Sequence, residues 1–109
     1  MSERNERIAA LNDELRRTFE GGRVVQTRGV AALGPELVAE IHRKVRTFAA
    51  FTPDNDPYGQ HDFGSFGIAG VRVMWKIDHY DPWLRGGSED PADPAKTTRV
   101  LTVMLAEEY

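Results

Sequence analysis

Residues 63–78 read FGSFGIAGVRVMWKID, and this stretch decides the fold because apolar and polar side chains alternate along it. A period of two is typical of a β-strand that turns one face to a core. Ala69-Gly70 interrupts the alternation where a tight turn needs glycine. The stretch therefore predicts a β-hairpin whose core face carries Phe66, Ile68, Val71, Val73, Trp75 and Ile77.

The position of the turn also predicts the register of the hairpin. A turn at Ala69-Gly70 pairs Phe63 with Lys76 and, when both strands are continued, His61 with Asp78. Directly opposed residues have Cβ atoms roughly 4.5–5.5 Å apart and share one face of the sheet. We therefore expect a hydrogen bond between the His61 ring and the Asp78 carboxylate, on the face opposite Trp75.

Two amphipathic helices and one strand are predicted before the hairpin. The first helix ends at Gly21-Gly22, and the second begins at Pro35, a residue well suited to a first helical position, and reaches about Ala50. Between them, Arg23 to about Thr27 is rich in β-branched residues and predicts a strand. The helices are indicated by apolar residues at spacings of three and four, namely Ile8, Leu11, Leu15 and Phe19, then Leu37, Ile41, Val45 and Phe48.

The segment 97–106 is ambiguous between helix and strand. Its threonines and valines favour a strand, whereas its length and the pairs Val100–Met104 and Leu101–Leu105 favour a helix that begins after Asp93-Pro94. We predict a helix. The order is then α-β-α-β-β-α, and the expected fold is α+β, a two-layer sandwich of three helices over a small antiparallel sheet with a β-hairpin.

Length and composition place the chain among ordinary folded proteins. Its 109 residues, 40% of them apolar, predict a single α+β domain over residues 1–109. The chain has no cysteine, which excludes thiolate chemistry and zinc-finger or iron–sulfur ligation. No apolar run reaches the ~18 residues of a membrane span, and the charged N-terminus is unlike a signal peptide. We expect a cytoplasmic protein that needs no cofactor and contacts no membrane.

The charges are unevenly distributed along the chain. Residues 1–50 hold nine Lys and Arg against seven Asp and Glu, whereas residues 51–109 hold five against ten. An acidic second half argues against direct nucleic-acid binding, because neutralisation of phosphates supplies most non-specific affinity. It would suit a protein partner with a basic surface, although solvated carboxylates also simply keep a small protein soluble.

Histidines and carboxylates near the end of the hairpin suggest one chemical alternative. A metal-dependent hydrolase or nuclease would need such side chains as ligands or as an oriented base, and the candidates are His61, Asp78, His79 and Asp81. The competing interpretation is a cross-strand pair that only fixes the register of the hairpin.

A second set of residues is typical of a binding surface. Met74 falls on the polar face, while Tyr80 and Trp83 follow the strand, where an exposed aromatic ring can anchor a partner. Trp83 could instead close the core. The candidate binding residues, with the carboxylates of the irregular segment that follows, are Met74, Asp78, Tyr80, Asp81, Trp83, Glu89, Asp90 and Asp93.

Several motifs in their order and spacing resemble the bacterial domain-of-unknown-function family 3768. They are IAALNDELRRTF, DNDPYGQHDFGSF, WKIDHYD and GSEDPADPAKTTRVLTVMLAEEY. The resemblance implies a small stand-alone bacterial protein, commonly encoded on plasmids and mobile elements, and brings no catalytic role. We therefore expect a non-enzymatic acidic binding protein, an inhibitor or accessory factor of a host or defence protein.

Overall fold

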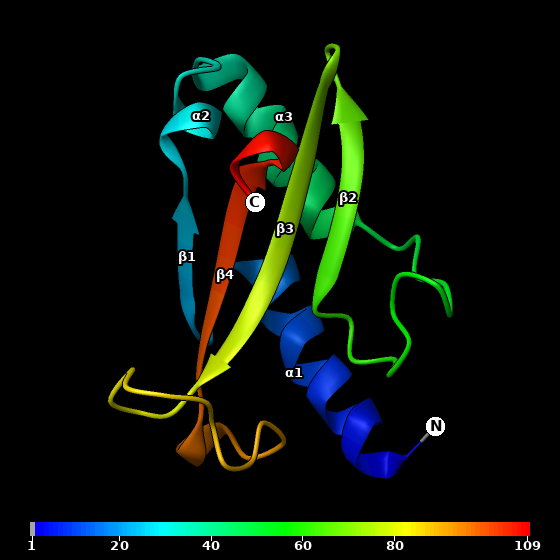
Figure 1. Ribbon diagram of the computed structural model, residues 1–109, viewed down its shortest axis with the longest axis vertical. Helices are drawn as coiled ribbons and strands as arrows, with labels where there is room; N and C mark the ends of the chain where they lie inside the picture. Colours follow the sequence, from blue (N-terminus) through cyan, green and yellow to red (C-terminus); the bar gives the residue numbers. More distant parts are fainter. Residues whose placement is uncertain (1) are drawn as a thin grey trace.

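The computed structural model describes residues 2–109 and combines one four-stranded sheet with three α-helices (Figure 1). The strand order is β1-β4-β3-β2, and α1 and α3 lie behind the sheet in the view of Figure 1. The expected α+β fold is confirmed. The elements are α1 (Glu3–Thr18), β1 (Arg23–Gln26), α2 (Arg28–Ala31), α3 (Pro35–Thr47), β2 (Phe63–Ile68), β3 (Val71–Tyr80), the 3-10 turn η1 (Pro94–Lys96), β4 (Thr98–Leu105) and the 3-10 turn η2 (Ala106–Glu108).

The hairpin forms in the predicted register. β2 and β3 are antiparallel, with Phe63 opposite Lys76, and the turn residues Ala69 and Gly70 both have positive φ angles, of 50° and 78°. Such angles at both central residues are typical of a tight hairpin turn. The register continues to the carbonyl of Asp62, which accepts a hydrogen bond from the Ile77 N–H at 2.8 Å.

The predicted C-terminal helix is wrong, because residues 98–105 form strand β4. Burial alternates over most of β4, and Arg99, Leu101 and Val103 are buried on the helix side of the sheet. The β-branched residues that favoured a strand decide the outcome, since β4 pairs with β3 on one side and with β1 on the other. A central strand forms backbone hydrogen bonds with two neighbouring strands and buries its apolar side chains. A surface helix at the same residues would gain neither.

The predicted antiparallel sheet and element order are corrected as a consequence. β1 runs parallel to β4, with Val24 opposite Leu101, so the sheet is mixed. The third helix is α2 rather than a C-terminal one, and the Thr27 hydroxyl caps it by accepting a hydrogen bond from the Val30 N–H. The predictions of α1, β1 and α3 are confirmed, with α3 ending at Thr47 instead of near Ala50.

Trp75 is the largest fully buried side chain, and the predicted core face is confirmed by its burial with Val73 and Ile77. Its indole lies against Gly64, its partner on β2: a Cβ atom at that glycine would be 2.4 Å from the indole Nε1. Phe48 packs edge-on against the indole from the helix side, with ring centroids 5.5 Å apart. The tryptophan thus requires a residue without a side chain on the neighbouring strand.

We predict that Gly64→Ala destabilises the protein by about 1–3 kcal/mol, because a methyl group cannot enter without displacing the indole. Gly67→Ala is the matched control on the same strand, since a Cβ atom there meets nothing closer than 3.7 Å. Urea unfolding of both variants measures the difference. Equal stabilities for the two variants would show that the indole does not depend on Gly64.

Candidate functional site

A buried polar cluster centred on Asn12 connects the helix layer to the sheet. Asn12 is fully buried, and its Oδ1 accepts hydrogen bonds from Arg99 Nε at 2.8 Å and from the His79 ring Nε2 at 3.1 Å. Its Nδ2 donates to the Gln60 carbonyl at 2.9 Å. One side chain of α1 thereby joins β3, β4 and the loop before β2.

Sequence reasoning missed Asn12, although a signal was present. Asn12 lies at helical spacing between Ile8 and Leu15, so it falls on the apolar face of α1. A polar residue on such a face needs a buried partner.

His79 and Arg99 have lowered pKa values in this cluster. Burial, and then the nearby positive charge of Arg99, lower the pKa of His79 from 6.5 to about 4. Burial likewise lowers the pKa of Arg99. His79 is therefore a neutral hydrogen-bond donor to Asn12 at neutral pH, which suits a structural role.

His61 lies on the helix side of the molecule, away from its predicted partner. Its φ angle is +54°, and its Nδ1 is 3.0 Å from Asp13 Oδ1 on α1. The ring stacks on Phe51, with centroids 4.0 Å apart and planes 3° from parallel. The predicted hydrogen bond with Asp78 is not formed, because β2 begins at Phe63 and the left-handed backbone at His61 redirects its side chain.

The four candidate metal ligands are not brought together. His61 contacts Asp13 and His79 contacts Asn12, while the carboxylate of Asp78 is hydrogen-bonded to Lys76, whose pKa this raises. The Asp81 carboxylate binds backbone groups of its own loop. Within residues 2–109, no group of three or more His, Asp or Glu side chains is arranged to hold a metal ion.

The loop after β3 presents Trp83 to solvent. Asp81 Oδ1 accepts hydrogen bonds from the N–H groups of Trp83 and Arg85, each at 3.0 Å, and the Asp81 N–H donates to the Gly86 carbonyl at 2.8 Å. Leu84 has a φ angle of +60° at the tip. Trp83 is 74% exposed, so the interpretation that it closes the core is wrong. A braced loop thus carries an uncovered indole.

A cavity of about 400 Å³ lies beside this indole. Its lining combines apolar surface with charged groups of both signs and is formed by Asp81, Pro82, Trp83, Gly87, Glu89, Ala95 and Lys96. We call this indole and cavity the Trp83 loop site. Asp81 and Glu89, both predicted binding residues, lie in it.

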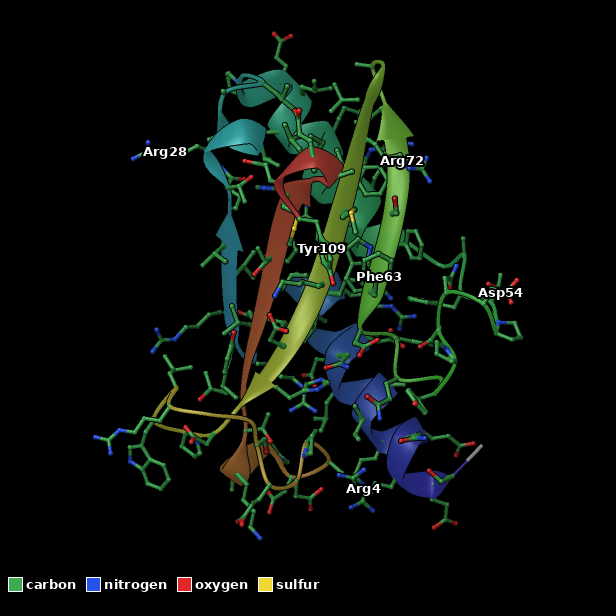
Figure 2. The ribbon with its side chains drawn as sticks, viewed as in Figure 1. Arg4, Arg28, Asp54, Phe63, Arg72 and Tyr109 are labelled. Atoms are coloured by element: carbon green, nitrogen blue, oxygen red, sulfur yellow. The ribbon has the colours of Figure 1, made fainter. Side chains whose placement is uncertain are left out.

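Of the other predicted binding residues, Tyr80 lies near the Trp83 loop site and Met74 lies away from it. Tyr80 is half-buried and pairs with Gly87 at the base of the loop. Met74 is also half-buried, but the strand between Met74 and Tyr80 spans roughly 20 Å. Met74 is therefore not part of the Trp83 loop site. It pairs with Met104 on the sheet face opposite the core, in front of which Tyr109 lies in Figure 2.

The carboxylates after the loop are largely engaged within the protein. Asp90 forms an ion pair with Arg4 at 3.5 Å, and Asp93 Oδ1 accepts a hydrogen bond from the Ala95 N–H at 2.9 Å. Glu89 lies 3.5 Å from Lys96, and its side chain is 76% exposed. Of these three carboxylates, Glu89 has the greatest freedom to meet a partner.

Comparison with known protein families places the chain in one of them. A family model described as "Protein of unknown function (DUF3768)" matches residues 26–108, which is more than half of the chain. No curated protein and no solved structure is significantly similar to the chain. No helix among residues 2–109 is long and apolar enough to cross a membrane.

The lowered pKa of His79, about 4 against 6.5, predicts a pH-dependent stability. Between these values the unfolded chain binds a proton that the folded protein does not, so the free energy of unfolding decreases as the pH falls. We expect a loss of about 1–2 kcal/mol across this window, less than the full pKa shift would give, because the ring is only partly buried and solvent screens its interactions. Urea unfolding across it should show a smaller loss in His79→Gln, whose amide can still donate to Asn12. Identical pH dependence in both proteins would contradict the assignment.

Proposed function

The chain belongs to the DUF3768 family, whose description gives no activity, and we propose that the protein is a non-enzymatic acidic binding protein. It acts on a protein partner as an inhibitor or accessory factor, and the Trp83 loop site is its main contact. The assignment of that partner to a host or defence system of a bacterium rests on the family resemblance alone.

The single observation that carries this proposal is the exposed indole on a braced loop. Trp83 is 74% exposed, while the loop around it is held by two hydrogen bonds from backbone N–H groups to the Asp81 carboxylate and by one from the Asp81 N–H to the Gly86 carbonyl. Tryptophan is enriched among residues that dominate binding energy, because its large apolar ring is desolvated by the partner. A preorganised loop lowers the entropy cost of that contact.

The charge distribution supports a partner with a basic surface. The protein has a net charge of -3, and residues 51–109 carry ten acidic against five basic side chains. Glu89 is exposed at the rim of the Trp83 loop site, where complementary charges accelerate association more than they strengthen it. Asp90 and Asp93 contribute to the same field but are also needed for local structure.

The alternative of a metal-dependent hydrolase or nuclease has no comparable support. Its four candidate ligands, His61, Asp78, His79 and Asp81, each have a different partner in the described chain. Hydrolysis with a metal requires several of them on one ion with an open position. Among the described residues, no such set of ligands favours the hydrolase or nuclease alternative over a binding protein.

We predict that Trp83→Ala weakens partner binding by about 2–4 kcal/mol, or roughly 30- to 1000-fold in Kd, without loss of stability. The partner is first captured from the native host and purified, and calorimetry then compares the variants. Tyr109→Ala is the control, because Tyr109 is a similarly exposed aromatic residue, at 79%, outside the loop. Unchanged affinity of Trp83→Ala would exclude the Trp83 loop site as the main contact.

We also predict that Glu89→Lys slows association with a basic partner and reduces its dependence on salt, because it reverses a charge at the rim of the site. Stopped-flow association rates at several salt concentrations measure the effect. Glu36→Lys is the control, because it reverses the charge of an exposed residue on α3 and changes the net charge by the same amount. Equal effects of the two reversals would show that only the overall charge matters.

A further inference from the structure

We infer that the cavity beside His61 is a second binding site, separate from the Trp83 loop site, and that it takes the cationic guanidinium of an arginine side chain. The inference rests on the proposed function only in assigning that arginine to a protein partner. The lining of the cavity by itself favours a compact positive group.

The cavity has a volume of about 430 Å³ and a lining suited to a cation. Its lining includes the aromatic rings of Phe51, Tyr58 and His61 and the carboxylate of Asp56, and it contains no lysine or arginine. The ring of Tyr58 is available to a ligand, since this residue is 70% exposed. An aromatic face attracts a guanidinium through its quadrupole.

Two hydrogen-bond acceptors converge on the cavity. Nδ1 of His61 is held by both carboxylate oxygens of Asp13, at 3.0 and 3.1 Å, so in the neutral ring Nδ1 carries the proton and Nε2 the lone pair. Nε2 lies 3.7 Å from Asp56 Oδ2, too far for a direct hydrogen bond. A donor placed between these two atoms can bond to both.

The geometry of the two acceptors is fixed before any ligand arrives. The Asp56 side chain is 6% exposed, and its Oδ1 accepts hydrogen bonds from the N–H groups of Gln60 at 3.0 Å and His61 at 3.2 Å. These bonds hold His61 at its φ of +54°, a backbone conformation uncommon outside glycine. Phe51 supports the ring by stacking. Strain maintained in this way is concentrated at functional sites.

The loop that forms most of the cavity is acidic, and the nearest buried cation, Arg16 at 5.5 Å from the Phe51 ring, is paired with Asp13. Residues 52–62 contain Asp54, Asp56 and Asp62 and no lysine or arginine. Figure 2 shows Asp54 at the outer edge of this loop, where it extends the negative field toward solvent. A guanidinium is weakly hydrated, planar and rich in donors, so it matches a site with two acceptors and the exposed ring of Tyr58 better than an ammonium does.

The site is also distant from the Trp83 loop site. In Figure 1 the loop containing His61 projects at the right of β2, while the loop after β3 projects at the lower left. A ligand in one cavity therefore leaves the other open, and the two sites can be tested independently.

The test is titration of the whole protein with N-acetyl-L-arginine amide, monitored through the ring resonances of His61 by NMR. We expect saturable shifts with a millimolar Kd. The neutral citrulline analogue, which has the same shape without the charge, should give no saturable shift. A lysine analogue should bind more weakly. Absence of shifts with the arginine probe, or equal shifts with citrulline, would overturn the inference.

Two variants test the residues. Asp56→Asn retains an oxygen to accept the Gln60 and His61 N–H groups but removes the charge, and it should weaken arginine binding roughly tenfold or more. Tyr58→Ala, at an exposed position, should weaken it by a smaller factor and serves if Asp56→Asn fails to fold. Trp83→Ala should bind the probe like the wild type. Wild-type affinity for the arginine probe in both Asp56→Asn and Tyr58→Ala would contradict the site. If Trp83→Ala changes only partner binding, that result concerns the proposed function and not the arginine site.

Discussion

The packing of Trp75 against Gly64 is the constraint on which the rest of the structure depends. The indole occupies the space that a side chain at Gly64 would fill, so this neighbouring position has to be glycine. Phe48 and Phe51 then meet the indole edge-on, with ring centroids 5.5 and 6.1 Å away. Trp75 is the largest of the ten buried residues in the core cluster between the helices and the sheet, and a ring of this size buries more apolar area than an aliphatic side chain.

From this indole a continuous series of contacts reaches the surface. Arg16 is 1% exposed, lies 5.3 Å from the Trp75 ring and donates hydrogen bonds to Asp13 and to the Val45 carbonyl. Asp13 in turn binds His61, which stacks on Phe51. A buried arginine is tolerated only when its donors are largely satisfied. The Asp13 carboxylate that accepts a hydrogen bond from Arg16 therefore also orients the imidazole beside the cavity.

The two candidate binding sites share a design in which an aspartate organises a loop through backbone N–H groups. Asp81 does so beneath Trp83, and Asp56 does so beneath His61. In both cases a residue with positive φ, Leu84 or His61, is maintained next to an aromatic ring. A rigid loop gives up little conformational entropy when a ligand binds to it.

The sequence by itself determined the hairpin, its register and the burial of Trp75, because alternation and a glycine turn are local properties. It also located α1, β1 and α3. It could not decide the secondary structure of residues 98–105, because their helical and strand preferences are balanced. Only pairing with both β1 and β3 selects a strand there. Nor could it place His61 or Asn12, since their partners are 48 and 87 residues away and are brought near only when the helix layer closes on the sheet.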